Sequence, residues 1–395
     1  MREQRASKPL RIVGLVTHNS HGGAQTALTE LMSALAARGH RTEVWFLYRT
    51  RGEHEIEAPG ARLFCPRPAG GASGYLRAAL ALHRALRQER PDALVSFLPL
   101  ANVFGQMLAM LAGVPARVAS QRSPGWTYAG AIQVLDRIAG TIGIYGQTVC
   151  VSEAVRNSFA HYPAAYRDRL IVVSNGIAPR STCAEKPVAR RALGLPARAF
   201  VIAAIGRLCA EKNLKLIVDA LEQTPGVLLV VAGDGENRAA LERYVQTIGV
   251  RDRVIFLGHL ATAKVSELLS AADLLVQPSL FEGQSNAMLE AMAAGLAVLA
   301  SDIPPQRQTL IDEEGRHCGL LLPLGEPETW AHALQRLQID AKERQRLGRA
   351  AAERSAAFTV ERMAEGFEAA ILAAGGRHAD YRPGLDQTKA GPSNV

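Results

Sequence analysis

Two glutamates stand with seven residues between them in the segment E-G-Q-S-N-A-M-L-E, at Glu282 and Glu290. The first lies in a polar turn that contains Gly283, and the second lies about one turn inside the helix predicted after it. A glycine-containing loop that leads into a helix offers backbone N–H groups to an anion, because the first N–H groups of a helix have no partner within it. The segment therefore predicts an anion site that is flanked by two carboxylates.

The elements around this loop are those of a buried sheet. The apolar segment Leu274–Gln277 reads as the end of a buried strand, and Ser279–Ser285 forms the polar turn. A helical pattern then begins at Asn286 and ends at Gly295, and Ala297–Ala300 is the next short strand. Without a wider context, the same pattern would also fit a strand–helix–strand unit whose glutamates are simply solvated.

The N-terminal half opens with a second loop of this kind. A strand at Leu10–Thr17 is followed by H-N-S-H-G-G-A-Q, by a helix that runs to Arg38, and by a strand at Glu43–Leu47. Gly22 and Gly23 stand at the N-terminus of that helix, where a phosphate or a sugar could approach the backbone. The motif is not G-x-G-x-x-G, so a dinucleotide is poorly supported, and Gly-Gly alone is more often a plain turn.

Length and composition set the broad class. A chain of 395 residues predicts two domains, and alternating strands and helices in each half predict parallel sheets covered on both faces. The N-terminal segment has no apolar signal region, and the longest nearly apolar run, Val103–Ala116, is too short to span a bilayer. Five scattered cysteines without C-x-x-C favour a reducing cytoplasm and no structural zinc.

Charge is distributed unevenly. Residues 1–180 hold 21 Lys and Arg against 11 Asp and Glu, a balance of +10, whereas residues 181–395 hold 24 against 26. This asymmetry suggests an anionic partner for the N-terminal half, such as a membrane surface, a phosphorylated lipid or a nucleic acid. An arginine-rich coding bias would produce the same asymmetry.

The full context P-S-x-x-E-G-x-x-N-x-x-x-E-A-M-A-x-G, which ends in A-S-D-I-P, resembles the E-x7-E region of the retaining GT4 glycosyltransferases. The resemblance extends over roughly Leu10–Ala374 and is strongest from Gly206 to Pro305. It implies an α/β GT-B fold, in which two Rossmann-like, doubly wound parallel-sheet domains face a cleft.

Domain boundaries follow from this fold and from the breaks in the pattern. We expect residues 1–178 to form an acceptor-binding domain and residues 179–198 a linker, since Pro179, Pro187 and Pro196 interrupt the alternation there. Residues 199–358 would form the nucleotide-sugar domain, and residues 359–374 a helix that crosses back to the first domain. The polar residues 375–395 are expected to be a disordered tail.

The resemblance also implies roles for individual residues. Arg207 and Lys212, in G-R-L-C-A-E-K-N, would stabilise the departing diphosphate, although such a pair in a surface loop is usually only solvated. Glu282 would face the donor sugar, with the amides of Gly283–Asn286 nearby, and Glu290 would accept hydrogen bonds from the ribose hydroxyls. The catalytic set is therefore Glu282, Arg207 and Lys212. The donor-binding set is Gly22, Gly23, Gly206, Arg207, Lys212, Gly258, Gly283, Ser285, Asn286 and Glu290.

No cofactor and no obligatory metal are expected. Asp234 in G-D-G-E resembles a D-x-D metal motif only superficially, and a turn after a strand is the better interpretation. Cations and helix N-termini can stabilise a leaving diphosphate without a metal.

One feature departs from the family pattern. Many GT4 enzymes place a histidine of the first domain against the donor sugar, but the corresponding segments here, S-F-L-P-L-A-N and A-S-Q-R-S, contain none. They look more like the branch with an S-E-R-N-type motif. Arg122 and Asn102 are therefore weak candidates for contact with acceptor or donor sugar, and a plain surface role for Arg122 is nearly as well supported. Without a protein base, the departing diphosphate could itself take the acceptor proton on the face of attack, which would retain the anomeric configuration.

These implications lead to one expected function and several alternatives. We expect transfer of a hexose or N-acetylhexosamine from a nucleotide sugar, favouring a UDP-sugar, to a lipid-linked, lipopolysaccharide or exopolysaccharide acceptor. We expect a cytoplasmic site, with peripheral binding to anionic lipid at the inner face of the plasma membrane as an option, and no binding of nucleic acid. A GDP-mannose-dependent mannosyltransferase and a nucleotide-sugar epimerase of the same fold are alternatives, as is a non-catalytic subunit that binds nucleotide sugar or lipid.

Overall fold

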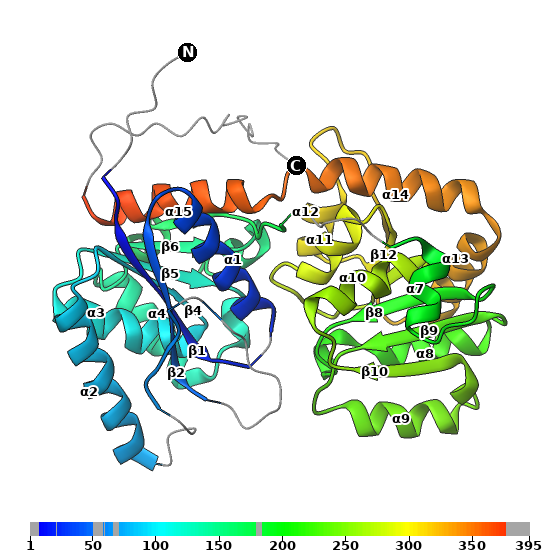
Figure 1. The fold of residues 1–395 in the computed structure, drawn as a ribbon, viewed down its shortest axis with the longest axis horizontal. Coiled ribbons are helices and arrows are strands. Elements are labelled where there is room, and N and C mark those ends of the chain that lie inside the picture. Colours follow the sequence, from blue (N-terminus) through cyan, green and yellow to red (C-terminus); the bar gives the residue numbers. More distant parts are fainter. Residues whose placement is uncertain are drawn as a thin grey trace.

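The computed structural model describes residues 8–20, 22–49, 58, 60–65, 71–178 and 184–376, with residues 71–73 described by their backbone alone. In this part of the chain the strands form two parallel sheets, one in each of two lobes (Figure 1). The first sheet has the order β3-β2-β1-β4-β5-β6-β7, and the second has the order β10-β9-β8-β11-β12-β13. The prediction of two doubly wound α/β domains is confirmed.

The first sheet is built from short runs of apolar residues that are buried on both faces. Its central strands read as nearly continuous apolar segments because helices cover both faces of a parallel sheet. The strands are β1 Arg11–His18, β2 Arg41–Tyr48, β3 Arg62–Leu63, β4 Ala93–Phe97, β5 Ala116–Gln121, β6 Gln147–Cys150 and β7 Leu170–Val172.

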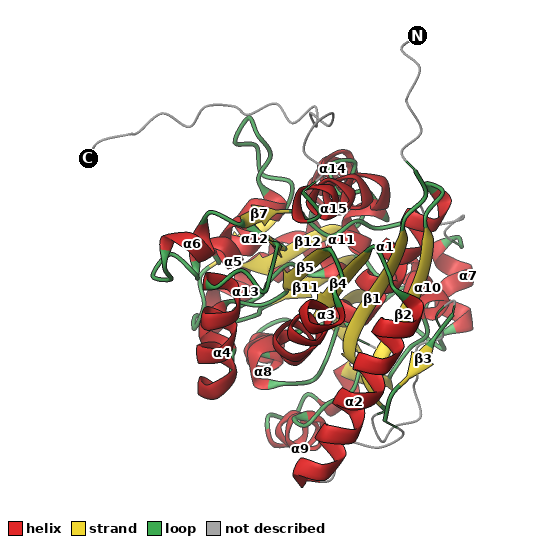
Figure 2. Cartoon of the chain, turned by 90° about the vertical axis from the view of Figure 1, so that its left-hand side faces the viewer, coloured by secondary structure: helices red, strands yellow, loops and turns green. Residues whose placement is uncertain are grey.

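Different helices cover the two faces of this sheet. Residues Ile12 and Val16 of β1 pack with α1 and α15, whereas Val13 and Leu15 pack on the opposite face with α2 and α3. Figure 2 shows α1 and α15 on one side of the sheet and α2, α3 and α4 on the other. The helices of this domain are α1 Gly23–Ala37, α2 Gly71–Glu89, the π-turn η1 Ala101–Gly105, α3 Gln106–Ala112, η2 Gly125–Thr127, α4 Gly130–Thr141, α5 Glu153–Asn157 and α6 Ala164–Arg167, with α15 Val360–Ala374 added from the C-terminal end.

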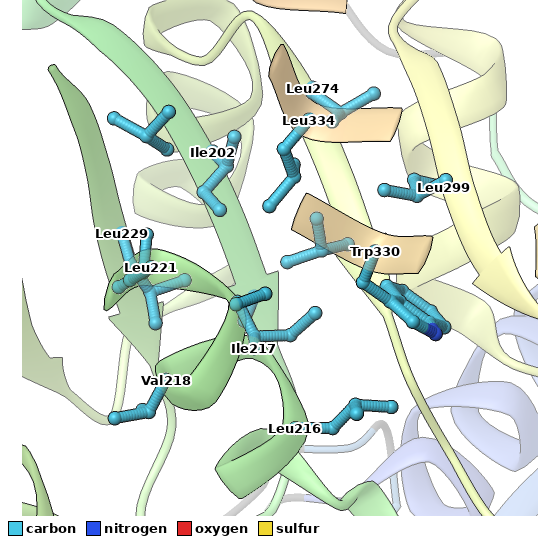
Figure 3. Close-up of a cluster of buried hydrophobic side chains, with 14 of the residues drawn as sticks. Ile202, Leu216, Ile217, Val218, Leu221, Leu229, Leu274, Leu299, Trp330 and Leu334 are labelled. Carbon is cyan, nitrogen blue, oxygen red and sulfur yellow. The ribbon is translucent and has the colours of Figure 1, made fainter. Parts of the chain in front are cut away.

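The second domain repeats the same plan. In Figure 3, Ile202 and Leu274 from the strands meet Ile217 from α8 and Trp330 from α13, in a core from which water is excluded. The strands are β8 Phe200–Ile205, β9 Val227–Ala232, β10 Val254–Gly258, β11 Leu274–Gln277, β12 Ala297–Ser301 and β13 Leu320–Leu322. The helices are α7 Lys186–Ala192, η3 Ala210–Lys212, α8 Leu214–Glu222, α9 Arg238–Thr247, η4 Arg251–Arg253, α10 Thr262–Ala271, α11 Asn286–Ala293, α12 Pro304–Leu310, α13 Pro327–Ile339 and α14 Ala341–Ser355.

The segment expected to be a linker contains a helix of the second domain. Within α7, Ala189 is buried, and it belongs to the same apolar cluster as Leu195 and the strand residue Val201. The guanidinium of Arg190 also lies 2.7 Å from the carboxylate of Asp273. Residues 186–196 are therefore part of the second domain, and the expected linker is wrong over that range. Residues 179–183 and 377–395 lie outside the described residues.

Helix α15 returns to the first domain. It carries Met363 and Phe367 into the core under the first sheet, and Glu368 lies 2.7 Å from the guanidinium of Arg38, which directly follows α1. A parallel β-bridge joins Ile177, near the end of the first domain, to Thr359, which directly precedes α15. Among the helices that the structure describes, none combines the length and apolarity needed to cross a membrane.

Candidate functional site

The carboxyl ends of strands from both sheets meet between the two domains. Asn286, at the start of α11, donates to the carbonyl oxygen of Gly23 in the first domain at 3.0 Å. Asn175, which follows β7, donates to the side-chain oxygen of Asn286 at 2.7 Å, and its backbone N–H donates to Gln284 at 2.7 Å. Ligands of open α/β sheets bind beyond the carboxyl ends of the strands, so this junction is the candidate site.

The glutamate loop is held by its own sequence. Strand β11 ends at Gln277, and Ser285 caps the following helix by accepting a hydrogen bond from the backbone N–H of Met288 at 3.3 Å. The helix begins at Asn286, as the pattern predicts. The backbone conformation at the start of α11 is thus fixed by a local cap.

Glu282 and Lys212 form an ion pair across 70 positions of sequence. The ammonium of Lys212 lies 2.5 Å from Oε1 of Glu282, and the two side chains are 23% and 12% exposed. The same oxygen accepts hydrogen bonds from Gln277 at 2.9 Å and from Ser279 at 2.8 Å. Three donors on one oxygen hold this carboxylate in a single orientation.

Arg207 and Gly206 lie directly beside this pair. Arg207 is 65% exposed and lies 3.8 Å from the carboxylate of Glu211, so its guanidinium is not buried in a tight pair. Gly206 has a φ of 146°, and a side chain there would contact the stem of Lys212. Arg207 and Lys212 thus lie in one loop after β8, from which Lys212 reaches the glutamate loop.

Glu290 and Gly258 come from different elements of the second domain, helix α11 and the end of strand β10. Glu290 lies on α11 about one turn from its start and is partly exposed. Gly258 ends β10 with a φ of 69°, and its carbonyl accepts a hydrogen bond from Gly233, which follows β9, at 2.7 Å. The donor-binding candidates of the second domain thus lie in loops after β8, β10 and β11 and at the start of α11.

Gly22 and Gly23 face the second domain from the first. Gly22 precedes α1 in an extended conformation, and the carbonyl of Gly23 is the acceptor for Asn286 described above. The structure therefore brings the Gly-Gly loop against the start of α11, next to the glutamate loop.

Arg122 is located at the interface between the domains. Its side chain donates to Asn175 and stacks on Phe97 with 4.6 Å between the guanidinium carbon and the ring centroid. A methyl group at Gly283 would overlap the carbonyl oxygen of Arg122, so the two loops are in close contact. Burial lowers the pKa of Arg122. Its Nη1 is buried and has no hydrogen-bond partner among the residues that the structure describes.

Asn102 does not belong to the site. Its side chain is buried and accepts from Ser96 at 2.8 Å, while its amide donates to the carbonyl of Ser120 and to Gln121. These hydrogen bonds satisfy the polar group inside the first domain and leave it unavailable to a substrate. The expectation that Asn102 contacts a substrate is therefore corrected, because its side chain lies in the interior of the first domain.

The sequence patterns missed three residues that the structure brings to the junction. Asn175 and Gln284 join the two domains, and His18 ends β1 with Ser20 and Gln25 hydrogen-bonded to its ring at 2.6 and 3.0 Å. Burial and the charge of Arg207 lower the pKa of His18. The only signal for these residues was their position directly after a predicted strand or in the loop between strand and helix, in H-N-S-H-G-G, S-N-G-I and E-G-Q-S-N.

Within the described part of the chain, one group of side chains near the site could hold a metal ion. Ligand atoms of Cys209, Glu211 and Glu236 lie within 4.8 Å of one another. Burial raises the pKa of the Cys209 thiol, which opposes the thiolate that a metal requires. Asp234 instead lies 3.1 Å from Arg238 and accepts from the N–H of Gly235, an arrangement that fits a turn.

Two family models match the chain, one for each domain. Residues 21–180 match the model described as Glycosyltransferase Family 4, and residues 185–354 match the model described as Glycosyl transferases group 1. Together these ranges span most of the chain.

The curated relatives of the chain are also named as glycosyltransferases. The chain is 27% identical to the putative glycosyltransferase EpsF of Bacillus subtilis, over 84% of this chain and 88% of that protein. It is 25% identical to the lipopolysaccharide core biosynthesis glycosyltransferase LpsE of Rhizobium meliloti, over 84% and 91%. It is also 31% identical to the 2-deoxystreptamine N-acetyl-D-glucosaminyltransferase of Streptomyces fradiae, where the match spans about half of each chain, 55% and 54%.

Solved structures of glycosyltransferases share the fold. Anabaena HepE in complex with UDP-glucose superposes with a TM-score of 0.77 at 20% identity, over 91% of this chain and 98% of that one. WaaG, a glycosyltransferase involved in lipopolysaccharide biosynthesis, superposes with a TM-score of 0.73 at 19% identity, over 91% and 99%. The chain therefore belongs to the group 1, family 4 glycosyltransferases, and its two domains form the GT-B fold.

Proposed function

We propose that the chain is a retaining glycosyltransferase that moves a hexose or N-acetylhexosamine from a UDP-sugar to a lipid-linked or surface-polysaccharide acceptor. The observation that carries the proposal is the ion pair of Lys212 with Glu282, in the loop that leads to Asn286 and its contact with Gly23 of the first domain. HepE, solved with UDP-glucose, supports the choice of nucleotide, and the names of LpsE and WaaG, which mention lipopolysaccharide biosynthesis, support the class of acceptor.

The chemistry assigned to these residues begins with the donor diphosphate. Arg207 and Lys212 would stabilise its negative charge while the bond between the anomeric carbon and the diphosphate oxygen breaks. Lys212 would then be shared between the diphosphate and Glu282. Glu282 would accept hydrogen bonds from the hydroxyls of the sugar ring as the ring gains positive charge.

Retention of configuration requires attack on the face that the diphosphate leaves. In this mechanism the acceptor oxygen bonds to the anomeric carbon on that face, and its proton passes to the departing diphosphate oxygen. Glu290 would hold the ribose diol throughout the step, and no metal is required. The acceptor would enter from the first domain, at the cytoplasmic face of a membrane.

The test is a panel of radiolabelled UDP- and GDP-sugars, incubated with the purified chain and a total lipid extract, with and without excess EDTA. Label from a UDP-sugar that passes into the lipid fraction, mostly unaffected by EDTA, is the expected result. Transfer from GDP-mannose alone would replace the donor assignment, and free epimerised sugar would identify an epimerase. Binding without turnover would mean a non-catalytic subunit. Complete loss in EDTA, restored by Mg²⁺ or Mn²⁺, would direct attention to Cys209, Glu211 and Glu236.

A further inference from the structure

Helix α4 presents an apolar stripe to solvent. Val134, Leu135, Ile138 and Ile142 recur at helical spacing along one face and are 57%, 41%, 48% and 68% exposed. A helix on the surface of a globular domain ordinarily turns such a stripe toward the core. The exposure of this stripe on α4 therefore needs a structural explanation.

The opposite face of α4 is held inward by a polar network. The buried carboxylate of Asp136 accepts hydrogen bonds from Gln121 at 2.8 Å, from the hydroxyl of Tyr166 at 2.8 Å and from the hydroxyl of Tyr145 at 3.1 Å. Rotating the helix to bury its apolar stripe would break these three hydrogen bonds and leave their buried donors without an acceptor. The rotation of α4 is thus determined by Asp136, and the apolar stripe is left outside.

The elements next to α4 also carry exposed apolar side chains. Turn η1 contacts α4, and α3 contacts α2, so the elements lie in a row on one side of the first sheet (Figure 2). We call the exposed apolar side chains of this row the α2–α4 face. Its members are Leu76 and Leu80 on α2, Phe104 on η1, Met110 and Leu111 on α3, and Val134, Leu135, Ile138 and Ile142 on α4.

The exposed charged side chains that the structure describes on α2, η1, α3 and α4 are arginines. Arg84 and Arg87 continue the stripe of Leu76 and Leu80 along α2, and both are exposed, as is Arg137 on α4. The carboxylates of residues 71–142 are engaged elsewhere: Glu89 pairs with Arg11 and Arg62, Asp92 accepts from the N–H of Arg11, and Asp136 is buried. An apolar surface with exposed arginines favours an anionic partner.

The face also leads to the candidate site. Trp126 precedes α4 and is 58% exposed, and its ring packs edge-on against Phe281 with 4.8 Å between the centroids. Phe281 is the residue before Glu282 in the glutamate loop. Trp126 thus places an exposed aromatic ring between the start of α4 and the glutamate loop.

We propose that the α2–α4 face docks on an anionic lipid bilayer and that a lipid-borne acceptor reaches the site past Trp126. The acceptor part of this inference rests on the function proposed above, whereas docking does not. Apolar side chains with flanking arginines are the composition of a bilayer-surface element, in which arginines reach the headgroups while the apolar residues enter the acyl boundary. A second copy of the chain fits less well, because a two-fold contact would set the same arginines against each other.

The experiment measures co-sedimentation of the whole chain with phosphatidylglycerol vesicles and with phosphatidylcholine vesicles, without donor or acceptor. Wild type should bind the anionic vesicles more tightly, and the double variant Ile138→Ser/Ile142→Ser should bind them about tenfold or more weakly, because two apolar side chains no longer enter the bilayer. Arg84→Ala/Arg87→Ala should also weaken binding and reduce its dependence on salt. Ile339→Ser, which changes an 85% exposed isoleucine of the second domain, is the matched control and should bind as wild type does.

Fluorescence gives a second readout from the same samples. Of the three tryptophans, Trp45 and Trp330 are fully buried, so Trp126 is the one that a lipid could reach. Brominated lipid in anionic vesicles should quench part of the emission of wild type, and this quenching should be lost in Trp126→Phe and in the double isoleucine variant.

Several results would overturn the inference. Equal binding of wild type to both vesicle types would show that anionic lipid is not preferred. Unchanged binding of the folded double isoleucine variant would show that the α2–α4 face does not dock on the bilayer. A self-association that this variant abolishes, without vesicle binding, would assign the face to a second copy. Because these assays contain no substrate, failure of the donor panel would leave the docking result standing, and the reverse also holds.

Discussion

At the scale of single residues, the ion pair between Lys212 and Glu282 links the two parts of the proposed chemistry. We expect Lys212→Ala to lower turnover by roughly 10²-fold or more, because the variant removes a cation from the departing diphosphate in a partly dehydrated site. Steady-state kinetics with a saturating donor measure this loss. Lys215→Ala removes an exposed lysine that pairs with Asp219 one turn further on and serves as the control. Wild-type turnover in Lys212→Ala would make the loop an ordinary surface turn.

The two glutamates should differ in the kinetic constant that they control. Glu290 is directed at the nucleotide in our proposal, which is common to ground state and transition state, so Glu290→Gln should raise the donor KM roughly ten- to a hundredfold. Glu282 is set against the ring that gains charge, so Glu282→Gln should act mainly on kcat. Circular dichroism verifies that both variants fold. The roles are wrong if both variants change only KM, or if Glu290→Gln keeps full activity.

His18 provides a dependence on pH. Since burial and Arg207 lower its pKa below the usual 6.5, the native state binds a proton less readily than the unfolded chain does. This residue's contribution to stability should therefore be complete above pH 6.5 and should decline as the pH falls toward the lowered pKa. Urea unfolding between pH 7.5 and pH 5.5 should show a smaller loss for His18→Gln than for wild type. Identical pH dependence in the two proteins would contradict the assignment.

At the scale of elements, the contact between the glutamate loop and the loop after β5 sets how closely the domains approach. A methyl group on Gly283 would overlap the carbonyl oxygen of Arg122, and it would also meet Val151 of the first domain. We expect Gly283→Ala to hold the domains apart, with a larger radius of gyration by small-angle scattering and a large loss of activity.

Gly130→Ala is the control for this variant, because a methyl group at Gly130, the first residue of α4, would meet no atom within 4 Å. The second domain itself should stay folded in Gly283→Ala, since the overlap involves only atoms of the other domain. An unchanged radius with wild-type activity would show that the loops separate without consequence.

The elements themselves show what sequence patterns can predict. Strand and helix positions in both domains agree with the pattern, because parallel strands buried on both faces read as short apolar runs. Helix α7 was missed because Pro187 was read as a break, although proline is well tolerated in the first turn of a helix. The local pattern also could not indicate that the apolar stripe of α4 faces outward.

At the scale of the whole molecule, α15 makes the first domain depend on the C-terminal end of the chain. Phe367 is fully buried and lies 5.7 Å from Phe97, centroid to centroid. We expect Phe367→Ala to cost about 3–5 kcal/mol in the stability of the first domain, through lost burial and the cavity that remains. The measurement is urea unfolding followed by hydrogen exchange in each domain.

The comparison between domains is the control for this prediction. Trp330→Ala removes a buried ring from the core of the second domain and should destabilise that domain first. If Phe367→Ala instead weakens protection in both domains equally, the two domains unfold as one unit, and the separate assignment of α15 to the first domain is wrong.

The sequence by itself determined the doubly wound fold and the family, because apolar periodicity and a long motif are local properties of the chain. It also indicated the loops after β8 and β11 and the Gly-Gly loop, since each stands between a strand and a helix. Only the tertiary structure decided that Lys212 pairs with Glu282, that Asn175 and Gln284 join the domains, and that Asn102 is interior. These are contacts between residues far apart in the chain, and they depend on how helices rotate and sheets meet, which the local pattern does not specify.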